Sequence, residues 1–175
     1  MAKKTEKYIP PQSQEQLILA WLRRSRESQM AHYEMAEILA KRGRLIGVPV
    51  ILFTTLVGTS ALASVAAEII PNWSKIIIGL LSISAAIMSG LQTFFGYADR
   101  AEKHRESAAR FGSIRRQFEI LYIRRDGAID EKVIDKLRKE LDALAKEALN
   151  VPIKIFKKTQ KNKLYADGVD YSKTN

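Results

Sequence analysis

Two long apolar stretches dominate the pattern of hydrophobic and polar positions along the chain. Residues 45–67 and 76–98 each contain 23 residues and no charged side chain. A helix needs roughly 20 apolar residues to cross the hydrocarbon core of a bilayer, which is about 30 Å thick. A soluble helix of this length would normally carry charge on its exposed side. We therefore predict two transmembrane helices over these residues, rather than a buried hairpin at the centre of a soluble bundle.

Helix-breaking residues lie between the spans and near the start of the first one. The short turn 68–75 contains Pro71, which stops a helix, and Trp73, which suits the outer membrane–water interface. Pro49 lies where a helix that restarts loses least from the missing N–H. We expect a kink or break at 43–49 rather than one unbroken helix.

Amphipathic helical patterns flank the spans on both sides. Residues 13–43 carry an apolar face, and the second span is expected to continue unbroken into a charged helix over 99–126. Asp126 and Gly127 would end that helix, and Asp130 is suited to cap a last one over 130–149. The predicted fold class is an all-α membrane protein, a two-transmembrane helical hairpin with long amphipathic cytoplasmic helices before and after it.

The predicted helices form one domain over 13–150, and the ends of the chain lack their pattern. Residues 1–12 are basic and contain Pro10 and Pro11, which predicts a mobile tail. Pro152 is expected to stop the last helix. Residues 151–175 are rich in lysine and then polar, which predicts a disordered or lipid-associated tail.

The charge distribution predicts the orientation in the membrane. Nine Lys and Arg residues lie in 1–44 and 19 in 99–175, against one in the turn. Basic residues accumulate on the cytoplasmic side, so both termini should be cytoplasmic and the turn outside. This topology and anionic headgroups explain the net charge of +10, and no specific nucleic acid is expected as a partner. The expected membrane-boundary anchors are Lys41, Arg42, Arg44, Trp73 and Arg100.

The residues offer little for catalysis. The chain has no cysteine, no glycine-rich phosphate loop and no metalloprotease motif, so we expect no enzymatic activity, cofactor or metal. Counted from the ends of the spans at about 1.5 Å per residue, His32 and His104 would lie roughly 10 Å apart in depth. Each is therefore expected to be a packing residue rather than half of a shared metal or proton site. His104 could alternatively contact a lipid phosphate or a ligand.

Small and hydroxylated residues in the spans suggest close helix contacts. A face of small residues lets two helix backbones approach, and it could serve packing within one hairpin or between protomers. Because two helices cannot surround a pore, any conduction would require several copies of the chain. The candidate packing face comprises Ser82, Ala86 and Gly90 on the second span and Thr55, Thr59 and Ala63 on the first. Candidates for pore-lining or interhelical polar contacts are Ser89, Gln92 and Thr93.

The layout of the whole chain adds a resemblance to these observations. It combines a hydrophilic helix with Trp21 and Tyr33, a double span with a short turn, and a characteristic emerging helix. That helix carries an alanine–histidine–aromatic pattern of Ala101, His104, Ala108 and Phe111. Over 13–150 the chain resembles the SLATT domain, the SMODS and SLOG-associating two-transmembrane effector domain.

The resemblance implies an oligomeric effector in the prokaryotic inner membrane. Such domains are regarded as effectors of nucleotide-signalled anti-phage conflict systems, encoded near a nucleotide second-messenger synthase or sensor. They are thought to form a pore or perturb the membrane, and so to arrest or kill the infected cell. The resemblance supplies no catalytic residues.

Two other functions are compatible with the sequence. A non-conducting anchor would recruit a partner through its cytoplasmic helices. It would tolerate bulky residues at Ala86 or Gly90 but lose function with a charge at Leu137 or Leu141. A subunit of a constitutive channel or transporter is disfavoured, because the spans lack a charged or broken-helix binding site.

Overall fold

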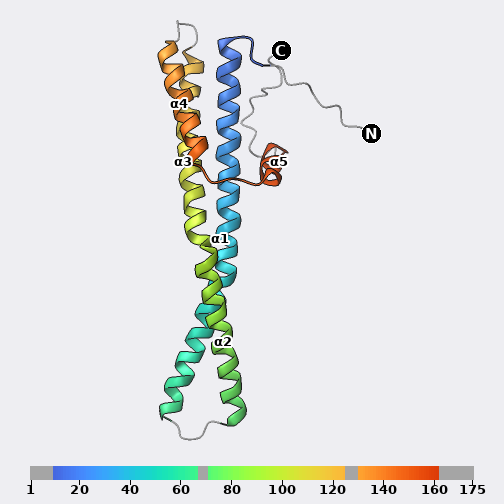
Figure 1. Cartoon of the computed structure of the whole chain (residues 1–175), viewed down its shortest axis with the longest axis vertical. Coiled ribbons are helices and arrows are strands. Elements are labelled where there is room, and N and C mark those ends of the chain that lie inside the picture. Colours follow the sequence, from blue (N-terminus) through green and yellow to red (C-terminus); the bar gives the residue numbers. More distant parts are fainter. Residues whose placement is uncertain (1–9, 67–70, 125–129, 162–175) are drawn as a thin grey trace, which may run out of the picture. The chain divides into compact units, whose positions relative to one another are not determined.

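The computed structural model describes residues 10–66, 71–124 and 130–161, and their side chains except those of 61–66, 72 and 161. These ranges contain helices and no strand (Figure 1). The helices are α1 (Gln14–Ala66), α2 (Asn72–Phe95), α3 (Tyr97–Ile123), α4 (Glu131–Glu147) and α5 (Ile153–Lys161). Two apolar stretches are long enough to cross a membrane, one in α1 and one beginning in α2. The predicted all-α, two-transmembrane fold class is confirmed.

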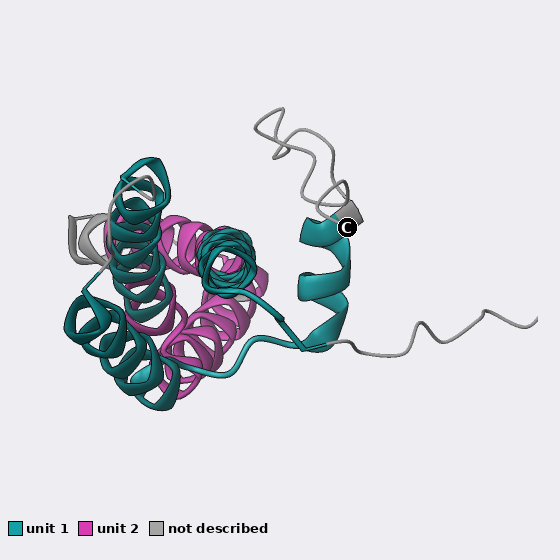
Figure 2. Ribbon diagram, turned by 90° about the horizontal axis from the view of Figure 1, so that it is seen from above, with its two compact units in different colours: residues 1–35, 103–175 teal, residues 36–102 magenta. Residues whose placement is uncertain are grey.

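The chain divides into two compact units, which Figure 2 colours separately. The first, here called the packed unit, comprises residues 1–35 and 103–175. The second, here called the hairpin unit, comprises residues 36–102. α1 and α3 each contribute residues to both units.

The packed unit has its own hydrophobic core, formed by α1, α3 and α4. The Trp21 ring lies against this core, 5.8 Å from the ring of Phe118. On α4, Ile134, Leu137, Leu141 and Leu144 are buried, whereas Val133 is exposed. The buried core residues are Ile18, Leu22, Phe111, Ile114, Phe118, Ile134, Leu137, Leu141 and Leu144.

The hairpin unit buries little of its apolar surface. Among its described residues between 40 and 100, only Ala85 is buried. Its large apolar side chains are exposed, and Phe94 reaches 82%. An apolar surface of this kind matches a lipid environment or contacts with other chains.

The structure corrects the expected break at 43–49. α1 is one helix of 53 residues with Pro49 inside it. A proline removes one backbone donor and crowds the preceding turn. The turns on either side keep their hydrogen bonds, and membrane helices tolerate this loss.

The predicted continuous passage from the second span into the next helix is also wrong. Gly96 lies between α2 and α3 in the left-handed region, with φ 52° and ψ 40°. Its N–H donates to the Gln92 carbonyl at 3.2 Å, and its own carbonyl accepts from the Arg100 N–H at 3.0 Å. Glycine adopts this conformation without the steric cost that a Cβ imposes, so α2 ends and α3 begins within one residue.

The sequence signals at the later helices have a mixed outcome. Asp130 caps α4 as predicted, since its carboxylate accepts from the Lys132 N–H at 2.9 Å. Asp126 and Gly127 lie outside the described residues. Residues 153–161 of the supposed tail form helix α5, so the prediction of disorder is wrong for them, and residues 162–175 lie outside the described residues. Pro152 begins this helix, because a proline is pre-organised for a first turn and its carbonyl accepts from the Ile155 N–H.

Gly112 lies at a close approach of α3 to α1, which gives a test of packing in the packed unit. A Cβ at this position would lie 2.6 Å from Nε2 of the buried Gln29 side chain. We predict that Gly112→Leu lowers the stability by about 1–3 kcal/mol through overpacking. The midpoint of thermal unfolding, followed by circular dichroism in detergent, should then fall by roughly 2–10 °C. Ser113→Leu is the control, since Ser113 is the exposed neighbour on the same helix. Equal midpoints for the two variants would contradict the close approach.

Candidate functional site

The small-residue face predicted on α2 lies apart from the contacts within the hairpin unit. Ala86 and Gly90 are exposed, and a Cβ at Gly90 would meet nothing within 4 Å. The contacts lie on another side of α2, where Ala85 is buried and the Gln92 amide would lie 3.5 Å from a Cβ at Gly47. Ala86 and Gly90 are therefore open to lipid or to another chain.

The other residues of this predicted face differ in how far their side chains are buried. Ser82 is half-buried, whereas Thr55 and Thr59 on α1 are exposed. The side chain of Ala63 lies outside the described residues. The structure thus brings Ser82 toward the contact side of α2 and leaves Thr55 and Thr59 at the surface.

Several hydroxyl groups in the spans are satisfied by their own helices. Thr59 donates to the Thr55 carbonyl at 3.0 Å, Ser82 to the Ile78 carbonyl at 2.8 Å, and Thr93 to the Ser89 carbonyl at 3.1 Å. Bonds of this kind let a hydroxyl face an apolar environment at low cost. The exposed Gln92 amide differs, because it makes no hydrogen bond to any residue that the structure describes.

Basic and aromatic side chains lie near the ends of the spans. Lys41 pairs with Glu37 at 2.8 Å. The Phe95 ring stacks on Tyr97, with ring centroids 5.2 Å apart. The other predicted anchors, Arg42, Arg44, Trp73 and Arg100, are all exposed.

Two buried histidines meet in the packed unit, contrary to the prediction. Nδ1 of His32 on α1 lies 2.9 Å from Nδ1 of His104 on α3, and both side chains are buried. The predicted separation counted backbone positions from the ends of the spans. It omitted the reach of two imidazole rings and the register that packing imposes. The signal in the sequence was that both histidines lie on the apolar stripes of their helices.

The geometry of the pair defines its chemistry. At 2.9 Å one Nδ1 carries a proton and donates it to the lone pair of the other, so at least the accepting ring is neutral. Burial, and then the nearby His104, lower the pKa of His32 to about 4. No group of three or more potential metal ligands occurs in the described part of the chain. The pair links α1 to α3 through an N–H···N hydrogen bond.

The alanine–histidine–aromatic pattern on α3 is a buried face. Ala101, Ala108 and Phe111 are buried together with His104, and the Phe111 ring lies 5.4 Å from His32. The small alanines on either side of His104 leave room for a neighbouring helix to approach. Tyr33, which was grouped with this pattern, is 43% exposed.

One comparison with known proteins identifies the family. The model of the SMODS and SLOG-associating 2TM effector domain family 4 matches residues 16–167, and the chain belongs to this family. No curated protein and no solved structure is significantly similar to the chain. Membership makes the protein a membrane effector of conflict systems, associated with SMODS and SLOG components, and confirms the resemblance. The match continues past residue 150 and includes α5.

The histidine pair predicts a pH dependence of stability. Folding lowers the pKa of His32 from 6.5 to about 4. Between these pH values the unfolded chain is therefore protonated at His32, whereas the folded chain is not. The free energy of unfolding is therefore highest, with respect to this group, above pH 6.5, and it decreases as the pH falls from 6.5 toward 4. The double variant His32→Leu/His104→Leu should lose less stability over this interval than the natural chain. Thermal unfolding at several pH values measures both slopes, and parallel curves would contradict the prediction.

Proposed function

We propose that the protein acts as an oligomeric pore, or as an assembly that perturbs the bilayer, in the inner membrane of a prokaryotic cell. When its conflict system senses infection, the assembly would arrest or kill the host cell. It would act without catalysing a reaction and without a cofactor. The trigger would come from a nucleotide second-messenger synthase or sensor encoded nearby, in keeping with the name of the family.

The observation that carries this proposal is the uncovered small-residue face of α2. Two spans cannot enclose a lumen, so a pore needs several hairpins in contact. Ala86 and Gly90 are exposed, and a Cβ at Gly90 would meet no described atom within 4 Å. Small residues allow close approach between helices in lipid. The face therefore suits a contact between protomers.

Exposed polar side chains on α2 support an assembly in which several chains surround a water-filled pore. Ser89, Gln92 and Thr93 are exposed and lie within about one turn of the helix. An amide without a hydrogen bond is costly in hydrocarbon. A neighbouring chain or a water-filled lumen would satisfy the Gln92 amide, whereas lipid would not.

The charge distribution supports an orientation with both termini in the cytoplasm, which places the packed unit on the side where a cytoplasmic signal arises. A trigger opens the assembly only if it binds the open arrangement better than the closed one. The packed unit exposes charged residues and has its own core. We therefore expect the trigger to bind this unit.

The alternative is a non-conducting anchor that recruits a partner. Exposed apolar residues on α3 favour it, since Ile120 and Ile123 are uncovered in the packed unit. Leu137 and Leu141, the positions at which a charge was expected to discriminate, belong to the hydrophobic core. A charge there would unfold the unit under either hypothesis, so Ile120→Glu is the better probe.

The two functions make opposite predictions for the double variant Ala86→Leu/Gly90→Leu. Under the pore hypothesis it should weaken assembly by roughly tenfold or more, since each 1.4 kcal/mol of lost packing changes an association constant about tenfold. It should also suppress the loss of membrane potential and growth when the chain is expressed with its neighbouring genes and triggered. The readouts are a potential-sensitive dye, growth, and cross-linking in the membrane.

Leu80→Phe is the matched control, because it enlarges another exposed position on the same span. This variant should depolarise the membrane like the natural chain. A membrane that stays sealed under a confirmed trigger would rule out the pore. Intact function in Ala86→Leu/Gly90→Leu together with loss in Ile120→Glu would establish the anchor instead.

A further inference from the structure

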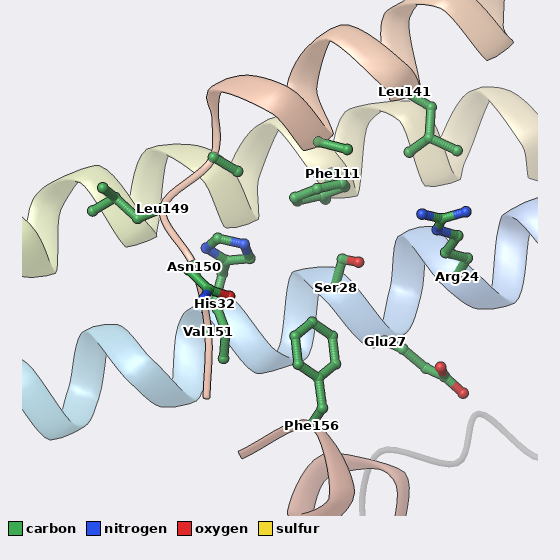
Figure 3. A pocket seen from close by; sticks show the side chains of 12 residues that line it. Arg24, Glu27, Ser28, His32, Phe111, Leu141, Leu149, Asn150, Val151 and Phe156 are labelled. Carbon is green, nitrogen blue, oxygen red and sulfur yellow. The ribbon is translucent and has the colours of Figure 1, made fainter. Parts of the chain in front are cut away.

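A pocket of about 430 Å³ opens in the packed unit between α1, α3, the end of α4 and α5 (Figure 3). Its volume falls in the range of small-molecule sites, which is roughly 300–1,000 Å³. The residues that line it are Arg24, Glu27, Ser28, His32, Phe111, Leu141, Ala145, Ala148, Leu149, Asn150, Val151 and Phe156. Neither the histidine pair nor the membrane hairpin explains why these side chains surround an open space.

The unpaired charge in the lining of the pocket is positive, which favours an anionic ligand. The Arg24 guanidinium makes no hydrogen bond or ion pair with any residue that the structure describes. The carboxylate of Glu27 is compensated, since it accepts from Arg23 Nε at 2.9 Å and from Gln160 Nε2 at 3.0 Å. The uncompensated charge in the lining is therefore positive. A guanidinium presents paired N–H donors that match the oxygens of a phosphate or carboxylate.

Aromatic and neutral polar groups complete the lining. The rings of Phe111 and Phe156 enter it from α3 and α5 (Figure 3). Aromatic rings of this kind suit the flat face of a nucleobase, which stacks without regard to sequence. The Ser28 hydroxyl and the Asn150 amide make no hydrogen bond to the described residues, so both can serve a ligand. The volume exceeds what a single ring with one carboxylate would fill.

α5 holds the remaining wall through contacts with α1. Lys158 forms an ion pair with Glu34, and Gln160 bonds to Glu27. Val151 and Thr159 are buried beside Phe156, which itself is half-buried. The pocket therefore exists only while α5 is docked, and the side chains that dock it lie next to the ligand space.

We propose that this pocket binds a nucleoside phosphate, with the phosphate at Arg24 and the base against Phe156. Ser28 and Asn150 supply hydrogen bonds to the sugar or the base. Because His32 both lines the pocket and bonds to His104, an occupant would touch the link between α1 and α3. Only this last, regulatory consequence rests on the proposed function, whereas binding itself does not.

The test is equilibrium dialysis of the full chain in detergent against labelled AMP and GMP, with adenosine, guanosine and inorganic phosphate as competitors. We expect at least one nucleotide to bind, and its nucleoside and inorganic phosphate to compete at least tenfold more weakly. Arg24→Gln should weaken binding about tenfold or more, as the loss of a charged hydrogen bond of roughly 1.5–3 kcal/mol implies. Phe156→Ala should weaken it by roughly 5- to 100-fold, the range expected for the loss of one stacked base.

Arg116→Gln is the matched control, since Arg116 is exposed on α3, lies outside the pocket and has no ion pair among the described residues. This variant should bind like the natural chain. Circular dichroism shows whether each variant is folded, and Arg24→Gln removes no described contact. No nucleotide binding at about 1 mM, a concentration that detects even weak sites, would overturn the proposal. Equal weakening by Arg116→Gln, or competition only by anionic lipid vesicles, would overturn it as well.

Binding and depolarisation are separate measurements, so the two proposals can fail independently. A chain that binds nucleotide but leaves the membrane sealed under a confirmed trigger would remove the pore and keep the pocket. A chain that depolarises the membrane but binds no nucleotide would do the reverse.

Discussion

The exposed apolar surface of residues 36–102 is the constraint on which the rest of the protein depends. Ile51, Leu80 and Phe94 are more than half exposed, and the spans around them contain no charged residue. Each Å² of apolar surface in contact with water costs about 25 cal/mol, so such a surface must be covered by lipid or by other chains. The environment, rather than contacts within the chain, therefore stabilises the hairpin unit. This is why the protein belongs in a membrane, and why the faces of α2 that remain open are available for assembly.

The packed unit, unlike the hairpin unit, buries its apolar side chains within the chain, as a fold in contact with water requires. It buries a core of leucine, isoleucine and phenylalanine from α1, α3 and α4, and leaves its charges at the surface. Its exposed ion pairs, such as Arg138 with Asp135, add little stability individually. They keep the helices soluble and leave the core to decide how the helices pack. The same unit holds the pocket and the histidine pair, so all the described polar chemistry that could receive a signal is concentrated outside the spans.

The sequence predicted correctly those features that depend only on residues close together along the chain. The length of the charge-free stretches gave the spans, and Asp130 was recognised as a cap because capping depends only on neighbouring residues. Pro49 and Gly96 were misjudged, since a proline does not always break a helix and a glycine sometimes does. α5 was missed because its composition resembles a basic tail, and its stability comes from docking on α1. The contact between His32 and His104 depends on helix register, which no local pattern in the sequence specifies.

The hydrophobic core sets that register, and two buried polar contacts accompany it. The histidine pair avoids the desolvation cost of a buried ion pair, but it forms only when the two rings face each other at hydrogen-bonding distance. One turn away, Gln29 lies against Gly112, and its Oε1 is buried without a hydrogen bond to the described residues. An amide oxygen left in this state costs about 1–3 kcal/mol. The present register thus satisfies the histidines and penalises the glutamine.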